Sequence, residues 1–230
     1  MIDGVPVVRE AFPHTVRLVT TARLRDSVLA ELVDGDDLAA LAEIEGATSR
    51  RLTAETRGIA GLPANELVHG VAHARFINAS FAYAKPRALS RFNGPDRGAW
   101  YAALEVETSV AEVAYHLTQA LADAGDFNAV VDYAEMHASL AGEFLDLRQR
   151  PDHQALDPDE TRGYAAGNAM ANAARAAGLN GVIYPSVRCP SGTCVAALWP
   201  HAVQSVAQGK VWRLTWNGKP EPQISRVDQV

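Results

Sequence analysis

The chain has 230 residues, of which 48% are hydrophobic and 21% are charged, a composition typical of a soluble globular protein with one sizeable domain and an extension. The net charge of -6 argues against a large nucleic-acid interface, because phosphate binding needs clustered positive charge, although a local basic pocket for one small anion is still allowed. The N-terminus shows no secretory signal, and no apolar run approaches the roughly 20 residues that span a bilayer, so we expect a cytoplasmic protein without membrane contact.

Residues 1–68 are expected to form a helical N-terminal extension. Their apolar side chains recur at helical spacing in two stripes, Leu24, Val28 and Leu32, then Leu38, Leu41 and Ile44. The intervening "DGDD" suggests a break, with Asp36 or Asp37 as the N-cap of the second helix. We expect this extension to pack on the main domain and to offer a contact surface.

Residues 69–230 alternate between strand-like and helix-like segments and predict an α+β domain. The runs "VAHARFINASF" and "GAWYAALE" are predicted strands, and residues 108–123 are a predicted helix with an apolar stripe facing the core. Two strands are expected in "FNAVVDYAEM" and "GEFLDL", followed by a small-residue helix that ends at Gly178. Three further strands are expected in "NGVIYPSV", "TCVAALWP" and "KVWRLTW".

Glu112 has two interpretations at this stage. The run from Ser109 to Glu112 fits the S-x-x-E capping box, in which the carboxylate reaches back to the Ser109 amide. Alternatively, the carboxylate stands at the edge of a cleft, where it binds sugar hydroxyls and stabilises positive charge that develops on a ring. Spacing favours the cap.

Several other side chains are candidates for an anion pocket. Arg75 stands in an apolar run, and Arg91 precedes the turn "FNGPD"; two guanidinium groups brought together would bind phosphate. Tyr101 follows Trp100, so one ring can fill the core while the other lines a site. Ser186 is by default a turn serine, because no G-x-S-x-G surrounds it.

Metal and nucleotide motifs are missing from the sequence. The seven histidines form no H-x-x-x-H or H-E-x-x-H pattern, and no Walker or G-x-G-x-x-G loop is present, so we expect no metal ion and no bound cofactor. Cys189 and Cys194 are expected to be free thiols, with a short disulfide as the alternative.

The combination of "ARF", "RFNG…GAWYAALEVETSVAEVAYH" and "GLNGVIYPSVRCPSGTCVAALWP" resembles the RES-domain family over roughly residues 70–205. These proteins are the toxins of bacterial RES–Xre toxin–antitoxin pairs. Ser90 departs from the glycine typical before the second arginine, and "RCPSGTC" is longer than the loop of short members. The resemblance implies a RES domain over residues 69–230 with an ADP-ribosyltransferase-like split, bent β-sheet around an NAD+ cleft.

The resemblance also implies roles for individual residues. Glu112, Arg91 and Tyr101 correspond to catalytic positions, and Arg75, Arg91, Tyr101 and Ser186 to positions that bind NAD+. NAD+ is then a substrate, cleaved by hydrolysis or phosphorolysis so that growth stops. The implied partner is an Xre-type antitoxin in a toxin–antitoxin hetero-oligomer. Two alternatives stay open: a protein ADP-ribosyltransferase that uses NAD+, and a non-catalytic partner-binding module.

Overall fold

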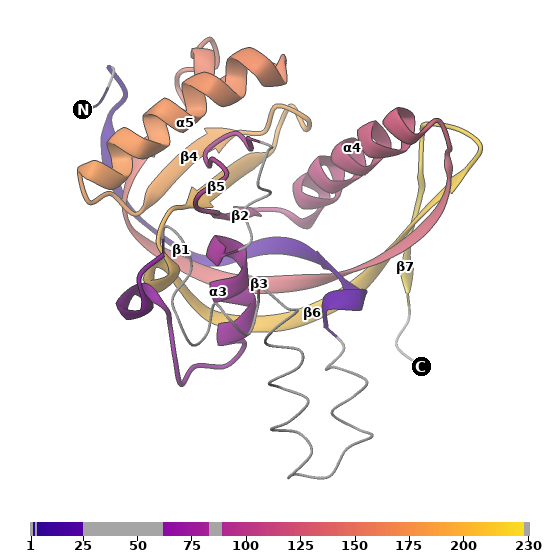
Figure 1. Ribbon diagram of the computed structural model, residues 1–230, viewed down its shortest axis with the longest axis horizontal. Coiled ribbons are helices and arrows are strands. Elements are labelled where there is room, and N and C mark those ends of the chain that lie inside the picture. Colours follow the sequence, from indigo (N-terminus) through magenta and orange to yellow (C-terminus); the bar gives the residue numbers. More distant parts are fainter. Residues whose placement is uncertain (1, 3, 25–61, 83–88, 228–230) are drawn as a thin grey trace.

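A computed structural model describes residue 2 and residues 4–24, 62–82 and 89–227 of the chain (Figure 1). It shows one seven-stranded sheet with helices on both of its faces. The strands are β1 (Val7–Thr20), β2 (Trp100–Ala103), β3 (Asn128–Asp146), β4 (Gly181–Pro185), β5 (Thr193–Ala197), β6 (Val203–Asn217) and β7 (Gln223–Val227). The main helices are α3 (Ala74–Ala82), α4 (Val106–Ala124) and α5 (Glu160–Ala176). None of these helices is long and apolar enough to cross a membrane.

The sheet is built around β3, which pairs with three other strands. Its partners are β1 and β6 in antiparallel register and β4 in parallel register. The order β1-β2-β5-β4-β3-β6-β7 has an additional β1–β3 pairing, so the first five strands form a closed circuit. Register shifts mark β-bulges in β1 between Phe12 and Thr15 and in β6 opposite Met136 and Ser139 of β3. Bulges bend strands and increase their twist, in keeping with the curved sweep of β1, β3 and β6 in Figure 1.

Two hydrophobic clusters lie in the protein. One gathers Phe76, Ile77 and Phe81 of α3 with residues of β1, β3 and β6. The other includes Met170 and Ala174 of α5 with residues of β4 and β5. In Figure 1, α4 and α5 lie on one side of the long strands and α3 on the other. The polar region described below lies on the α4 and α5 side.

The prediction of a helical N-terminal extension is wrong for residues 7–20. These residues form β1, and Val7 to Thr20 pair with β3 from Leu145 to Tyr133. The run "TVRLVT" has the β-branched residues and the alternation of a strand, but helical spacing further along the chain led to one interpretation for the whole segment. The helices predicted over Leu24–Ile44 fall almost entirely outside the described residues, and the boundary between residues 68 and 69 stays a prediction.

Two further segments differ from their predicted form. "ARFINASFA" is the helix α3, because its buried side chains Phe76, Ile77 and Phe81 lie on one helical face and do not alternate. The two strands expected in "FNAVVDYAEM" and "GEFLDL" are one continuous strand, β3. Its middle, "EMHASLA", is rich in residues that favour helices, and pairing with two neighbours overrides that preference.

The remaining predicted elements are confirmed. Residues 108–123 lie within α4, and β2, β4, β5 and β6 stand where strands were expected. The α5 helix is followed by Gly178 with φ 73°, a left-handed conformation that glycine adopts without strain.

Phe12 tests whether β1 belongs to the core. Its side chain is 8% exposed and contacts the Phe144 ring edge-on at 5.9 Å between centroids. We expect Phe12→Ala to lower the free energy of unfolding by about 3 kcal/mol, because truncation leaves a cavity. Urea unfolding would measure the change. The control is Val7→Ala on the same strand, which should shift stability by less than about 0.5 kcal/mol. Equal small effects for both would contradict a core role for Phe12.

Candidate active site

A pocket of about 440 Å³ opens between α4, α5 and the sheet, within the usual range of roughly 300–1,000 Å³ for small-molecule sites. It joins residues that are distant in sequence. Its polar lining comes from β1, the turn before β2, β2 itself, α4, α5 and the β4–β5 loop: Arg17, Arg91, Tyr101, Glu112, His116, Tyr164 and Arg188. Three guanidinium groups and one carboxylate therefore share a single cavity.

Glu112 lies in this pocket and does not cap its helix. The N-cap of α4 is Glu105, in extended conformation, and the Ser109 hydroxyl donates to the Val16 carbonyl oxygen at 2.6 Å. The Glu112 carboxylate instead accepts a hydrogen bond from the Ser186 hydroxyl at 2.6 Å between Oε1 and Oγ. The capping-box interpretation is wrong, because α4 begins one turn earlier than Ser109 and turns Glu112 toward the β4–β5 loop.

Ser186 is a buried side chain whose hydrogen bonds are taken within the protein. Its hydroxyl oxygen accepts the backbone N–H groups of Arg188 at 3.1 Å and Cys189 at 2.9 Å, while its proton goes to Glu112. The two N–H donors fix the direction in which the hydroxyl donates. Ser186 is not among the residues that line the pocket, so it contacts the carboxylate from the side that faces away from the cavity.

Tyr101 has its ring in the pocket and its hydroxyl in the adjacent turn. The hydroxyl accepts the Phe92 N–H at 2.9 Å and donates to Asn93 Oδ1 at 2.8 Å. Burial raises the pKa of this phenol above its ordinary value, so it stays protonated at neutral pH. Tyr101 thereby ties the turn that carries Arg91 to β2.

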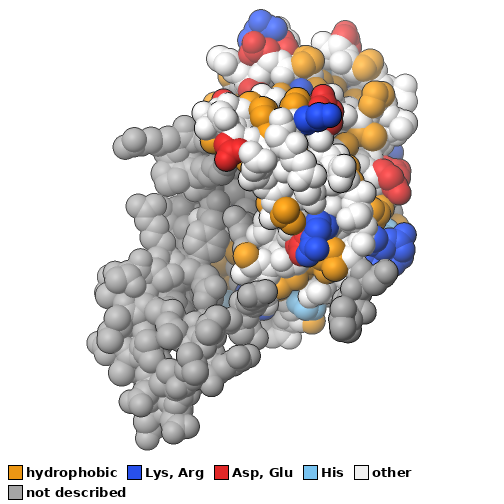
Figure 2. All heavy atoms as spheres, turned by 90° about the vertical axis from the view of Figure 1, so that its right-hand side faces the viewer, with side chains coloured by type: hydrophobic (Ala, Val, Ile, Leu, Met, Phe, Trp, Pro, Cys, Tyr) orange, Lys and Arg blue, Asp and Glu red, His pale blue; other side chains and the backbone are white. Residues whose placement is uncertain are grey.

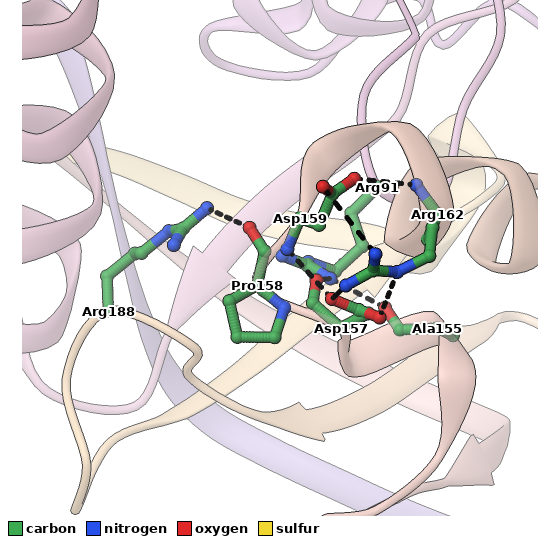
Figure 3. A network of polar contacts seen from close by, with 7 residues as sticks. All are labelled: Arg91, Ala155, Asp157, Pro158, Asp159, Arg162 and Arg188. Atoms are coloured by element: carbon green, nitrogen blue, oxygen red, sulfur yellow. Dashed lines mark hydrogen bonds and ion pairs between the residues drawn. The ribbon is translucent and has the colours of Figure 1, made fainter.

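Arg91 is buried, with 8% exposure, and held by backbone carbonyls. Its Nη1 donates to the Ala155 oxygen at 2.6 Å and to the Asp157 oxygen at 3.1 Å (Figure 3). Its guanidinium lies 5.3 Å from the centre of the Tyr164 ring. Burying a guanidinium is costly unless it is hydrogen-bonded, and these contacts meet that need while Arg91 still lines the pocket.

Two glycines of α5 make room for Arg91. A Cβ on Gly167 would lie 2.0 Å from the Arg91 carbonyl oxygen, and one on Gly163 would lie 2.9 Å from the Arg91 Nη1. Because these glycines are four residues apart, they share one face of the helix. The motif "GYAAG" is thus the sequence signal for the seat of Arg91, and inspection of the small-residue helix could have found it.

Two arginine side chains donate hydrogen bonds to the loop between Ala155 and Asp159 from different directions. Arg91 reaches its first carbonyls, while Arg188 donates to the Pro158 oxygen at 3.3 Å from the direction of the β4–β5 loop (Figure 3). The carboxylate of Asp157 pairs with Arg162 at 2.8 Å. The Arg188 guanidinium also lies 3.6 Å from the centre of the Tyr115 ring on α4. Arg188 therefore joins α4, this loop and the β4–β5 loop.

His116 stands one turn after Glu112 on the same face of α4. Its Nδ1 lies 3.9 Å from Glu160 Oε1, and Tyr164 donates to the same oxygen at 3.0 Å. Partial burial lowers the pKa of His116, against the opposing effect of the Glu112 carboxylate. Among the described residues, no three His, Cys, Asp or Glu side chains are grouped so that they could hold a metal ion.

Arg75, predicted to bind the ligand, lies outside this pocket. Its side chain is exposed on α3, donates to the Leu24 oxygen at 3.1 Å and covers the Phe76 ring at 4.7 Å. Arg17 of β1 occupies the pocket instead, with its Nη1 3.4 Å from the Tyr101 oxygen and its guanidinium over Trp100. The sequence signal for Arg17 is an arginine inside the strand-like run "TVRLVT", which the prediction of a helical segment over residues 1–68 obscures.

The cysteines are both free, and Cys194 lies near Glu112. Cys194 lines the pocket with its Sγ 3.9 Å from Glu112 Oε1, and burial raises the pKa of its thiol well above the ordinary value. The Cys189 Sγ lies 3.8 Å from the Thr108 hydroxyl.

The charged surface next to α4 and β7 is mixed in sign. On the face shown in Figure 2, acidic and basic side chains alternate with hydrophobic ones and form no continuous basic patch. Three arginines lie together in the pocket, Arg17, Arg91 and Arg188, where their positive charge would attract a small anionic ligand.

Comparison with known proteins gives three findings. The family model described as RES domain matches residues 67–217. The uncharacterised protein y4oC of Sinorhizobium fredii (strain NBRC 101917 / NGR234) is 27% identical over 192 residues, covering 84% of this chain and 78% of that protein. The crystal structure of the M. tuberculosis MbcT–MbcA toxin–antitoxin complex contains a chain that is 19% identical, with a TM-score of 0.37, covering 57% of this chain and 74% of that chain.

Gly167→Ala tests the close packing of Arg91 against α5. Alanine normally stabilises a helix interior relative to glycine by up to about 1 kcal/mol, but here the added methyl would collide with the Arg91 carbonyl. We therefore expect a loss of about 2 kcal/mol in unfolding free energy, in the range for overpacked sites. Thermal or urea unfolding would measure it. Ala165→Gly, two residues away on the exposed face of the same helix, is the control and should destabilise by about 1 kcal/mol through propensity alone. A stabilised Gly167→Ala variant would contradict the packing.

Proposed function

The chain belongs to the RES-domain family, and from this premise we propose that it is the toxin of a toxin–antitoxin pair that cleaves the nicotinamide–ribose bond of NAD+. The observation that carries the proposal is the Glu112 carboxylate, held by Ser186 in a pocket lined by Arg17, Arg91 and Arg188. A dinucleotide brings both a negative pyrophosphate and a ribose that becomes cationic as its bond breaks. The pocket offers a counterpart to each.

The cleavage needs a carboxylate but no acid for the leaving group. Nicotinamide in NAD+ is already positively charged, so it leaves as a neutral base when the bonding electron pair moves to its ring nitrogen. The ribose is left with oxocarbenium character, which an aligned carboxylate stabilises in a site of low polarity. In this proposal Glu112 lies beside that ribose, accepts its hydroxyls and stabilises the positive charge.

The arginines and Tyr101 fix the substrate. Arg17, Arg91 and Arg188 supply positive charge for the pyrophosphate, because guanidinium groups match phosphate oxygens in charge and geometry. The role first expected for Arg75 passes to Arg17, which lines the pocket. The Tyr101 ring provides an apolar wall for nicotinamide or its ribose, and its engaged hydroxyl keeps that ring in place.

Ser186 acts on Glu112 in this proposal, and not on the substrate. Its single proton is directed to Glu112 Oε1 by the two backbone N–H groups that its oxygen accepts. It is therefore a positioning residue that sets the orientation of the carboxylate. The expectation that Ser186 binds the nicotinamide end is replaced by this one.

The acceptor completes the reaction. Water gives ADP-ribose, inorganic phosphate gives ADP-ribose-1″-phosphate, and a nucleophilic protein side chain gives an ADP-ribosylated protein; in each case an acceptor oxygen or nitrogen forms the new bond to C1″ and loses a proton. We propose a free NAD+-consuming toxin, with protein modification as the alternative outcome. Its partner would be an Xre-type antitoxin that covers the pocket.

Glu112→Gln tests the proposed chemistry. We expect the rate constant for NAD+ consumption to fall by about 10²–10³, because the amide keeps the shape but loses the charge. Chromatography of nicotinamide and of the other products, with and without phosphate and with added cell lysate, would identify the acceptor. Adding the product of the neighbouring gene should suppress turnover. Glu107→Gln, an acidic residue in the first turn of α4, is the control. Unchanged turnover by Glu112→Gln, or none by the wild-type protein, would contradict the proposal.

Ser186→Ala tests the positioning role. Loss of the hydroxyl leaves a carboxylate and two N–H groups without their partner, which typically costs about 1–3 kcal/mol. We expect kcat to fall at least tenfold while KM for NAD+ changes little, and Ser186→Thr, which keeps a hydroxyl, to recover much of the rate. A rise in KM with kcat unchanged would instead assign Ser186 to substrate binding.

A further inference from the structure

The pocket follows one face of α4 for three turns. The α4 residues that line it recur at intervals of three and one, which keeps them on one side of a helix: Ser109, Glu112, Val113, His116, Leu117 and Ala120. At 1.5 Å per residue, the distance from the first to the last is about 16 Å. The cavity is therefore elongated, and Glu112 lies toward one end of it.

The chemistry of the lining changes along this length. The polar lining includes Arg91, Tyr101 and Arg188, and the Arg188 backbone N–H donates to the same Ser186 hydroxyl that donates to Glu112. Beyond His116 the helix offers Leu117 and Ala120.

The sheet contributes one charged side chain to the lining, Arg17, which is directed to the Tyr101 oxygen, and two apolar or aromatic ones beneath the second half of α4. It contributes Leu18 of β1 and Tyr133 of β3, and Tyr133 pairs with Thr20, two residues beyond Leu18. Contacts of Thr118 with Trp216 and Pro220 place this part of α4 toward β6 and β7, far from the β4–β5 loop (Figure 1). An apolar end with one aromatic side chain thus lies at the opposite end of the pocket from Ser186 and Glu112.

We propose that this apolar end, formed by Leu18, Leu117, Ala120 and Tyr133, binds the adenine base of the dinucleotide. The inference rests on the proposed function, which puts the bond to be broken beside Glu112. The nicotinamide must then lie at the Glu112 end, so the other base extends along α4 away from it. An adenine is flat and largely apolar, and an aromatic ring is its usual stacking partner.

The alternative placement puts adenine near Glu112 and leaves the ribose of nicotinamide against Leu117 and Ala120. That arrangement sets ribose hydroxyls and a developing positive charge against side chains that neither hydrogen-bond nor carry charge. Polar groups without partners are costly when they leave water. The direction with adenine at Tyr133 avoids this cost.

If adenine binds at this apolar end, Tyr133 should matter for NAD+ but not for a shorter substrate that lacks the adenylate half. Nicotinamide mononucleotide has the scissile bond but lacks the adenylate half, so it would reach Glu112 without contacting Tyr133. We expect Tyr133→Ala to raise KM for NAD+ about tenfold, equivalent to about 1.4 kcal/mol, which is within the range for stacking a base on an aromatic ring. KM for nicotinamide mononucleotide should change less than about twofold. Tyr133→Phe, which keeps the ring, should retain the wild-type preference.

Val130→Ala is the matched control, because Val130 lies on the same strand with 62% exposure and does not line the pocket. Urea unfolding of each variant would show that Tyr133→Ala is folded at the assay temperature. Equal changes in KM for both substrates, or no change for either, would overturn the adenine assignment while leaving NAD+ cleavage intact.

A binding measurement separates this inference from the proposed reaction. Calorimetric titration with AMP, which has no nicotinamide, should show binding to the wild-type protein that is lost in Tyr133→Ala and kept in Tyr133→Phe. This result would support the adenine subsite even if the protein failed to consume NAD+. No AMP binding at millimolar concentration, or binding that is unaffected by Tyr133→Ala, would overturn it.

Discussion

A strand inside a protein must find hydrogen-bond partners for its backbone on both edges, and β3 meets that requirement with three different strands. β3 is 19 residues long, and its neighbours β1 and β6 each pair with only part of that length. Bulges in β1 and β6 bend the pairing, so that both strands continue along β3 while β4 joins its C-terminal end. The curved surface that results holds α4 and α5 on one side, and the pocket lies between these helices and the sheet.

One hydrogen bond sets the orientation of the Glu112 carboxylate. The carboxylate meets the Ser186 hydroxyl, and Ser186 is itself set by N–H groups of the β4–β5 loop. The position of the carboxylate thus depends on a hairpin more than 70 residues away in sequence. The buried arginine on the other wall is fixed in the same manner, by backbone groups of a loop and not by an acidic side chain. In the part of the chain that the structure describes, both charged groups are held by hydrogen bonds from neutral partners and line the same pocket.

The sequence allowed prediction of the mixed α+β class, α4, α5 and the strands β2, β4, β5 and β6, because each of these has a local pattern. It did not reveal β1, although "TVRLVT" has the pattern of a strand, because the helical spacing of residues 24–44 favours a helix for the N-terminal segment as a whole. Arg91, Tyr101 and Glu112, predicted to share a site, line one pocket, and Ser186 contacts Glu112, while the roles of all four stay predictions. The choice of Arg75 over Arg17 shows the limit most clearly: both are arginines in short apolar runs, and only the β1–β3 register brings Arg17 into the pocket.

The backbone contacts of Arg91 have a consequence for how this loop can change through evolution. Nη1 is bound by the main-chain oxygens of Ala155 and Asp157, so the identity of the side chains there matters little to that grip. Other contacts constrain these side chains, since Ala155 and Leu156 are buried in the cluster with α5 and Asp157 pairs with Arg162, but the hold on Arg91 requires only the path of the main chain. The fixed requirement falls on α5, where Gly163 and Gly167 leave no room for a larger residue. Homologues that share the site are thus expected to be recognised by two small residues on a helix more readily than by the loop that holds the arginine.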